Sequence, residues 1–438
     1  MDATLTLPKG GLALSGLDEQ LLQPGTKGLP ISAPLRQGAI GVQGWNVLHG
    51  DTSFPVAVLK IEALQHNLAW MRRFCEHYGV LLAPHGKTTM SPQLFGAQLA
   101  NGAWGMTLAT ASQVQTAHRF GVRRVLLANQ LVARADIHAL LELMHDDPDF
   151  DCVALADSPD GVARLSAAVQ AHPLRRPLPL LVELGIPGKR AGCRGTEQAL
   201  ALARAIAAAP GLQLAGIEGY EGLLVSEDRA ADIAAVNAFL AQLCELVRQA
   251  DAEDLFGGDA ILLSAGGSSY FDLVARGFAR IGRTSRPLRA ILRSGCYLTC
   301  DHGLYQRHTS ALQEREAWLG DGLRAALEVW SVVQSRPEPG LAILGMGKRD
   351  ASYDVELPLA LMTHRPGPGT PVALPPGCAI VKMNDQHAYL RLPEGTDLRV
   401  GDLVGCGISH PCTTFDKWPL LLAVDARYAV HYAVNTVF

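Results

Sequence analysis

The feature that most constrains the fold of this chain is a regular alternation of short apolar runs and helix-like segments over residues 51–287. The runs are continuous rather than alternating, which is typical of parallel strands buried on both faces. They begin near Pro55, Val80, Gly105, Arg124, Asp151, Leu180, Leu214 and Ala260. Eight strand–helix units in about 250 residues predict an α/β protein built on a (β/α)8 barrel of the TIM type.

An open, doubly wound sheet is the alternative for the same alternation. The glycine-rich segment Ala265–Ser269 (AGGSS) follows the last of these runs. A dinucleotide-binding sheet carries its glycine-rich turn after the first strand instead. The position of the glycines therefore favours the barrel.

The sequence changes character after residue 287. Residues 288–438 hold β-prone runs such as Ala326–Ser335 (ALEVWSVVQS), which are separated by turns rich in Pro and Gly. This pattern predicts an antiparallel β domain. Residues 1–50 are rich in Gly, Leu and Pro and are expected to form an N-terminal arm that could join the β domain.

Composition excludes several classes of protein. The net charge is −4 and the pI about 6.4, with no basic stretch, so no nucleic-acid partner is expected. The N-terminus has no signal-peptide pattern, and no uninterrupted apolar run reaches the roughly 18 residues of a membrane span. Nine cysteines without a CxxC pair fit reduced thiols, so we expect a cytoplasmic protein that does not act at a membrane.

Polar side chains follow several of the apolar runs, at the edge where parallel α/β proteins bind ligands. Lys87 follows the second run, in the segment Pro84–Thr89 (PHGKTT). Gln130, Arg190 and Tyr220 follow three later runs. An isolated lysine is most often a solvated surface charge. A functional role for Lys87 therefore depends on the residues around it.

The glycine-rich loop suits a phosphate. Backbone N–H groups of Gly266 and Gly267 can approach an anion closely, and the hydroxyl of Ser268 can donate to it. Phosphate sites recur after the last strands of such barrels. A phosphate site together with a strand-end lysine predicts pyridoxal 5'-phosphate, because that cofactor needs a lysine for its Schiff base and a cradle for its phosphate.

A second candidate site lies near the C-terminus, in Gly407–Asp416 (GISHPCTTFD). His410 and Cys412 are two residues apart, which puts both side chains on one face of an extended strand. Imidazole and thiolate together suit zinc. A core histidine and a buried cysteine are the alternative, and Asp416 or His387 could add further support.

Taken together, these segments resemble the fold-type III pyridoxal-phosphate enzymes of the D-serine dehydratase and D-threonine aldolase family, whose barrel is related to alanine racemase. The resemblance covers roughly residues 50–425. Its motifs are PHGKTTMSPQLFGAQLANGAWGMTLAT, ELGIPGKRAG, GYEG, SAGGSS, ILRSGCYLTCD and SHPCTTFD.

The resemblance implies a role for each candidate residue. Lys87 would form the Schiff base, Arg190 would lie near the phenolic oxygen or imine of the cofactor, and Tyr220 would approach the pyridine nitrogen. The phosphate would be held by Gly266, Gly267 and Ser268, with Cys296 and Tyr297 closing the rim. A divalent metal would bind at His410 and Cys412. Relatives of this architecture pair as homodimers.

The function expected is a dehydratase, or deaminase, of 3-hydroxy-D-amino acids such as D-serine, D-threonine or 3-hydroxyaspartate, which gives a 2-oxo acid and ammonia. Retro-aldol cleavage to glycine and an aldehyde is the main alternative. Cys412 favours zinc and dehydration, whereas a carboxylate ligand such as Asp416 would favour Mn or Mg and the aldolase. Racemisation of the same substrates would need no metal site, and a non-catalytic cofactor-binding role would need neither the metal motif nor the β domain.

Overall fold

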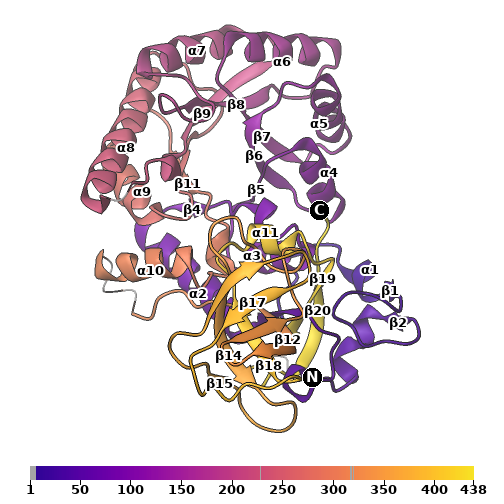
Figure 1. Ribbon diagram of the computed structural model, residues 1–438. Coiled ribbons are helices and arrows are strands. Elements are labelled where there is room, and N and C mark those ends of the chain that lie inside the picture. Colours follow the sequence, from indigo (N-terminus) through magenta and orange to yellow (C-terminus); the bar gives the residue numbers. More distant parts are fainter. Residues whose placement is uncertain (1–5, 227, 316–317, 319) are drawn as a thin grey trace. The chain divides into compact units, whose positions relative to one another are not determined.

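The computed structural model describes residues 6–226, 228–315, 318 and 320–438 (Figure 1). The chain forms two compact units. We call Arg72–Lys87 with Asn101–Gly295 the barrel unit. We call the other unit, which comprises the N-terminal segment up to Met71, Thr88–Ala100 and Cys296–Phe438, the β unit.

The barrel unit is built on eight parallel strands, in the order β4-β11-β10-β9-β8-β7-β6-β5. The ring closes between its two ends, where the amide of Trp104 donates to Leu82 O (2.7 Å) and that of Thr107 to Pro84 O (2.9 Å). The predicted barrel is therefore confirmed. The strands are β4 (Leu81–Leu82), β5 (Met106–Leu108), β6 (Arg124–Gln130), β7 (Asp151–Ala156), β8 (Leu178–Leu184), β9 (Leu212–Gly219), β10 (Ile261–Ala265) and β11 (Leu288–Leu292).

Helices surround the barrel strands (Figure 1). Local sequence begins several of them, because a side-chain oxygen accepts an otherwise unpaired amide of the first turn. Thr110 accepts from the amide of Gln113, and Ser158 accepts from that of Gly161 just before Pro159. The helices are α4 (Ala111–Arg119), α5 (Arg134–Asp146), α6 (Pro159–Ala171), α7 (Thr196–Ala208), α8 (Arg229–Ala252) and α9 (Phe271–Phe278).

The barrel interior is apolar. Ala83, Leu126, Leu181, Leu262 and Ile291 belong to one buried apolar cluster, to which the neighbouring strands β6 to β11 all contribute. Helix α8 is the one described helix long and apolar enough for a membrane span by length and composition. Its buried residues form the face with which it packs as a helix of the barrel unit.

The β unit contains a mostly antiparallel sheet in the order β15-β14-β18-β12-β13-β17-β16, to which β3, β19 and β20 are joined. Its strands are β3 (Val56–Lys60), β12 (Leu327–Glu338), β13 (Leu341–Leu344), β14 (Leu359–His364), β15 (Val372–Ala373), β16 (Ala379–Met383), β17 (Ala388–Arg391), β18 (Leu403–Gly407), β19 (Leu420–Val424) and β20 (Val430–Asn435). The predicted antiparallel domain is confirmed.

Helices and short strands complete the β unit. Helix α2 (Ile61–Tyr78) begins in this unit and ends in the barrel unit. The others are α1 (Ser15–Asp18), β1 (Leu21–Leu22), β2 (Leu35–Arg36), α3 (Pro92–Ala100), α10 (Leu304–Arg315) and α11 (Cys412–Phe415), with 3-10 helices η2 (Gln37–Val42), η3 (Val47–His49) and η6 (Cys296–Leu298). Ser91 and Pro92 begin α3: the Ser91 hydroxyl lies 3.5 Å from the amide of Leu94.

The N-terminal arm contributes to the core of the β unit. Leu29 and Val47 of the arm belong to the same buried cluster as Trp330, Leu422 and Val430. The arm is thus part of the β unit. This is the arrangement that the sequence left open when it indicated an arm that could join the β domain.

Two details of the predicted domain organisation are wrong. The first apolar run is β3, and it does not enter the barrel: it pairs antiparallel with β12, Val56 opposite Trp330, and parallel with β19. The eighth barrel strand is β11, which pairs with β10 and β4, so the barrel extends beyond the predicted boundary at 287. β3 is a buried run followed by a helix, like the strands of the barrel, whereas β11 is buried only at Ile291 and Leu292, so periodicity alone could not assign either strand to its sheet.

Candidate functional site

Lys87 lies at the carboxyl end of β4, the first strand of the ring. It belongs to the 3-10 helix η4 (Gly86–Thr88), and its side chain is exposed. The strand end is fixed by neighbouring backbone, because the amide of His85 donates to Arg293 O (3.1 Å) beyond β11. The lysine is therefore presented at the edge of the barrel where ligands bind.

Cations gather around this strand end. Burial lowers the pKa of His85 well below its ordinary value, and the charges of Lys87, Arg293 and Arg190 lower it further. These three cationic side chains lie close enough to act on His85, and one of them, Arg293, is paired with Glu218. Lys87 and Arg190 are cations that suit a ligand carrying phosphate and carboxylate groups.

Arg190 and Tyr220, two of the predicted site residues, lie next to each other. The Arg190 guanidinium stacks 4.9 Å from the centre of the Tyr220 ring. The ring also leaves no room for a side chain at Gly267 of the glycine-rich loop, because a Cβ built there would be 2.5 Å from Tyr220 Cε2. Tyr220 therefore joins the loop after β8 to the loop after β10.

The glycine-rich loop is held by a residue that the sequence analysis passed over. The amides of Gly266 and Gly267 donate to the two carboxylate oxygens of Glu221, at 3.0 and 2.9 Å. Glu221 is fully buried and follows Tyr220 in the GYEG segment. These two amides, which were expected to face the phosphate, hold the loop to Glu221 instead. Their role in phosphate binding stays a prediction.

Inside the barrel unit, further charged groups lie below the rim. Gln130, a predicted site residue, donates to Glu183 on β8. Burial raises the pKa of Glu218 to about 8, although its ion pair with Arg293 opposes the shift. Glu218 and Arg293 were missed by the sequence analysis. The signal was a charged residue within or directly after a continuous apolar strand.

The predicted metal motif lies in the β unit. Cys412 is the first residue of α11 and His410 precedes it, so the segment is not the extended strand expected from its spacing. The two side chains still meet: their hydrogen bond raises the pKa of His410 to about 9. The backbone of His410 is anchored by Ser352, whose hydroxyl accepts from its amide (3.2 Å), and by the Thr414 hydroxyl, which donates to its carbonyl (3.3 Å).

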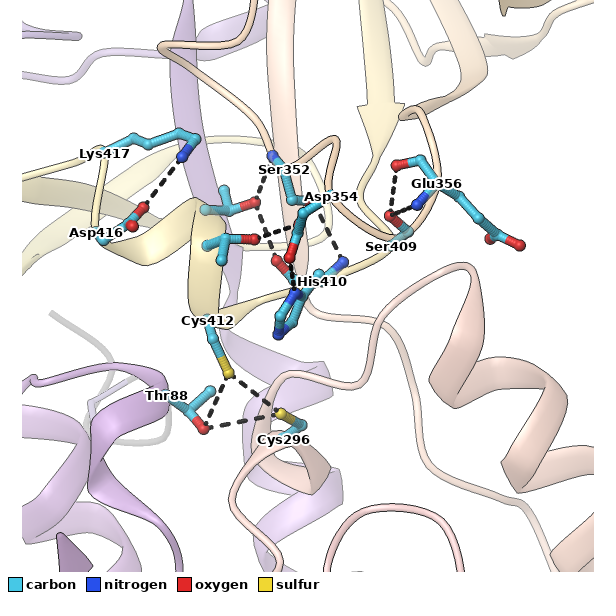
Figure 2. A network of polar contacts seen from close by, with 12 residues as sticks. Thr88, Cys296, Ser352, Asp354, Glu356, Ser409, His410, Cys412, Asp416 and Lys417 are labelled. Carbon is cyan, nitrogen blue, oxygen red and sulfur yellow. Dashed lines mark hydrogen bonds and ion pairs between the residues drawn. The ribbon is translucent and has the colours of Figure 1, made fainter. Parts of the chain in front are cut away.

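A carboxylate orients the His410 ring (Figure 2). Asp354 Oδ2 lies 2.6 Å from His410 Nδ1, and Thr413 donates to the other oxygen of Asp354 at 2.7 Å. This arrangement directs Nε2 as the metal-binding nitrogen, in the manner of a carboxylate behind a metal-binding histidine. Asp354 was not predicted from the sequence. The carboxylate considered there, Asp416, pairs with Lys417 (3.3 Å).

Cys412 has a second sulfur beside it. Its Sγ lies 3.7 Å from that of Cys296 and 3.5 Å from Thr88 Oγ1 (Figure 2). The hydrogen bond with Cys296 lowers the pKa of Cys412 well below its ordinary value, and those with His410 and Thr88 add to the shift. Tyr297, the other predicted rim residue, is buried with its hydroxyl 3.4 Å from Gln98.

The residues present fit the two predicted groups. The barrel unit offers the exposed Lys87, the cation Arg190 and a loop on which side chains at Gly266 or Gly267 would collide with Leu292 or Tyr220. These features suit a phosphorylated cofactor bound through a lysine. The β unit offers an imidazole and a thiol in contact, which suit a zinc-like metal. Within the described residues, no three His, Cys, Asp or Glu side chains are already gathered as a complete metal site.

Two family models match the chain. The alanine racemase N-terminal domain matches residues 59–279, and the serine dehydratase domain matches residues 326–424. The first match covers the barrel strands except β11, and the second contains the segment with His410 and Cys412.

Curated relatives match most of the chain. It is 27% identical over 353 residues to the 3-hydroxy-D-aspartate aldolase of Paracoccus denitrificans, covering 80% of this chain and 82% of the relative. It is 25% identical over 377 residues to the D-threonine aldolase of an Arthrobacter species, covering 84% and 88%. A shorter match, 35% over 74 residues, links it to the D-threo-3-hydroxyaspartate dehydratase of a Delftia species, covering 17% and 20%.

Solved structures share the fold. The D-threonine aldolase of Filomicrobium marinum aligns with a TM-score of 0.73 at 23% identity, covering 88% of this chain and 95% of that one. A cysteine-to-alanine variant of D-threo-3-hydroxyaspartate dehydratase, in its metal-free form, aligns with a TM-score of 0.67 at 21% identity, covering 88% and 97%. The chain therefore belongs to the D-serine dehydratase and D-threonine aldolase family of fold-type III pyridoxal-phosphate enzymes, and is a lyase dependent on that cofactor.

Proposed function

We propose that this chain is a metal-dependent dehydratase of 3-hydroxy-D-amino acids, which releases a 2-oxo acid and ammonia. The observation that carries the proposal is a thiol, Cys412, two positions from an imidazole, His410, whose ring Asp354 holds at 2.6 Å. A thiol and an imidazole favour zinc over harder ions. Zinc is a strong Lewis acid, and loss of a hydroxyl group needs such help because hydroxide is a poor leaving group.

In this proposal Lys87 holds pyridoxal phosphate and Ser268 contacts its phosphate, since Glu221 already takes the amides of Gly266 and Gly267. Arg190 and Tyr220 face the ring of the cofactor as a stacked pair. The cationic side chains near Lys87 also attract the substrate carboxylate. Pyridoxal phosphate, when bound, accepts the electron pair that is left on Cα when its proton is removed.

The chain's own residues then move the protons. Lys87, which would hold the cofactor through its amine, would also take the proton from Cα of the substrate. His410 and Cys412 would hold the metal, which supplies Lewis acidity toward the 3-hydroxyl group. Loss of the α-proton and of hydroxide leaves an enamine. Its tautomer takes up one water and releases ammonia, so the net products are a 2-oxo acid and ammonia.

Retro-aldol cleavage is the second candidate function, and the relatives that match most of the chain favour it. Both are named aldolases, for 3-hydroxy-D-aspartate and D-threonine. The same Lewis acid would then lower the pKa of the hydroxyl group, and the Cα–Cβ bond would break to give glycine and an aldehyde. A second ligand that is a thiol rather than a carboxylate leads us to prefer dehydration.

The proposal is tested by ammonia release from D-serine, D-threonine and D-threo-3-hydroxyaspartate. We expect release by the wild-type holoenzyme and none by Lys87→Ala, whose visible Schiff-base absorbance should also be lost. Lys189→Ala, an exposed lysine of the barrel unit, is the matched control and should keep both. Turnover to glycine without ammonia would replace dehydration by aldol cleavage.

A further inference from the structure

The thiols of Cys296 and Cys412 meet in the β unit although 116 positions separate them in the chain. Cys296 is the first residue of η6 and Cys412 the first residue of α11; both are half-buried, and neither forms a disulfide. Their sulfur atoms are 3.7 Å apart (Figure 2). The hydroxyl of Thr88 lies 3.7 Å from the first sulfur and 3.5 Å from the second. Two distant segments are thus folded so that one thiol faces the other.

The 3.7 Å between the two sulfur atoms can be compared with the sulfur–sulfur distances in a disulfide and in a zinc site. A disulfide brings its sulfur atoms to about 2.05 Å, so the pair is not a bond that the fold has closed. Two thiolates on one tetrahedral zinc, each at about 2.3 Å from the metal, lie about 3.8 Å apart. The observed spacing, which is that of a hydrogen bond between two thiols, also fits two ligands of one ion.

We propose that Cys296 is a third protein ligand of the metal held by His410 and Cys412. The inference rests on the metal site of the proposed function and names a further residue for it. Catalytic zinc sites in proteins commonly have three protein ligands and one open position for water or substrate. His410 and Cys412 alone leave such a site one ligand short, and Cys296 supplies it.

Cys412 is the shared member of the set, because it lies two positions after His410 in the chain and its sulfur lies 3.7 Å from that of Cys296. The three side chains are not yet gathered around a single point in the described residues. Binding of the ion would draw the three side chains together around it.

The second thiolate has a consequence for the choice of metal. Soft sulfur ligands select zinc over manganese or magnesium, which prefer oxygen. With two thiolates rather than one, the site discriminates more strongly against the harder ions. This specificity agrees with the dehydratase rather than the aldolase alternative.

The experiment counts the sulfur ligands of zinc directly. The holoenzyme is loaded with zinc alone under a thiol-free reductant, and zinc-edge X-ray absorption measures the number of sulfur atoms at about 2.3 Å. We expect two in the wild type and one in Cys296→Ser. Cys378→Ser, which removes a half-buried thiol elsewhere in the β unit, is the matched control and should keep two.

Zinc affinity, measured by competition with a chromogenic chelator, is the second readout. Cys296→Ser should weaken zinc binding by at least the roughly 10- to 100-fold that loss of an outer-shell partner costs. One sulfur in the wild type would overturn the inference and leave the site at His410 and Cys412 intact, even if no variant folds. A wild type that binds no zinc would overturn both the inference and the metal part of the proposed function.

Discussion

Two carboxylates hold residues of the proposed cofactor and metal sites in place, although neither is proposed to contact the cofactor or the metal itself. Asp354 fixes the ring of His410 from behind, and Glu221 fixes the amides of Gly266 and Gly267. Both act through hydrogen bonds to a neighbour, so they are positioning residues. Their removal should change affinity for metal or cofactor without removing a contact to the substrate.

For the metal site, we predict that Asp354→Asn weakens zinc binding by about 10- to 100-fold, because the His410 ring loses the carboxylate that orients it. Competition with a chelator measures the change on the holoenzyme. Asp385→Asn, which alters an exposed aspartate paired with Arg349, is the control and should bind zinc as the wild type does. Equal zinc affinity in Asp354→Asn would show that the histidine needs no such partner.

For the cofactor site, we predict that Glu221→Gln lowers affinity for pyridoxal phosphate. An amide offers one acceptor where the carboxylate offers two, so one loop amide loses its partner at a cost of about 1–3 kcal/mol, or roughly 5- to 150-fold in affinity. Titration of the apoenzyme by visible absorbance measures the effect. The exposed Glu197 of α7 provides the control variant Glu197→Gln. An unchanged dissociation constant in Glu221→Gln would show that the bonds of Glu221 to the loop do not contribute to cofactor binding.

At the scale of elements, the loop after β10 must pass close to the Tyr220 ring without a side chain. Gly267→Ala places its Cβ 2.5 Å from that ring, so either the loop or the ring has to move. We predict a cost of about 1–3 kcal/mol. Since 1.4 kcal/mol is tenfold, cofactor affinity should fall by about 5- to 150-fold. Gly16→Ala, which meets no atom within 4 Å, is the control.

Sequence periodicity could predict the kinds of element in this chain but not all of their partners. Continuous apolar runs indicated the barrel, and the strand-end position of Lys87 followed from them. The same runs could not separate β3 from β11, because partner choice depends on residues far apart in the chain, such as Val56 and Trp330. Glu221 and Asp354 were missed for the same reason: their hydrogen-bond partners lie 45 and 56 positions away.

At the scale of the whole molecule, one buried ion pair ties the N-terminal part of the β unit to its sheet. Lys60 Nζ lies 2.6 Å from Glu328 Oε1, and the other oxygen of Glu328 accepts from Trp330 Nε1 (3.0 Å) and Tyr428 Oη (2.9 Å). Burial alone would raise the pKa of Glu328, but the charge and hydrogen bond of Lys60 outweigh it and the pKa is lowered.

Because the pKa of Glu328 is lowered by folding, its contribution to stability is present above the unfolded-state value of about 4.3 and is lost as pH falls further. We predict that Lys60→Met lowers the free energy of unfolding at pH 7 by about 3–5 kcal/mol, since it leaves a buried carboxylate unpaired. The difference from wild type should shrink below about pH 4. Urea unfolding across pH measures it.

The control for that experiment is Lys9→Met, because Lys9 and Asp18 form an ion pair whose side chains are 61% and 55% exposed. An exposed pair contributes about 0–1 kcal/mol, so this variant should unfold almost as the wild type does. A Lys60→Met difference that stays constant down to pH 2 would contradict the role given to Glu328. Homodimer formation and a cytoplasmic location stay predictions.

The metal proposed at His410 and Cys412 is expected to drive dehydration of a 3-hydroxy-D-amino acid. Product analysis on the holoenzyme with D-threo-3-hydroxyaspartate tests this, before and after a chelator removes the metal and zinc replaces it. We predict oxaloacetate and ammonia in equal amounts, lost with the metal and restored by zinc. Glycine and glyoxylate, or a dehydration that survives complete removal of metal, would contradict the proposed role of the site.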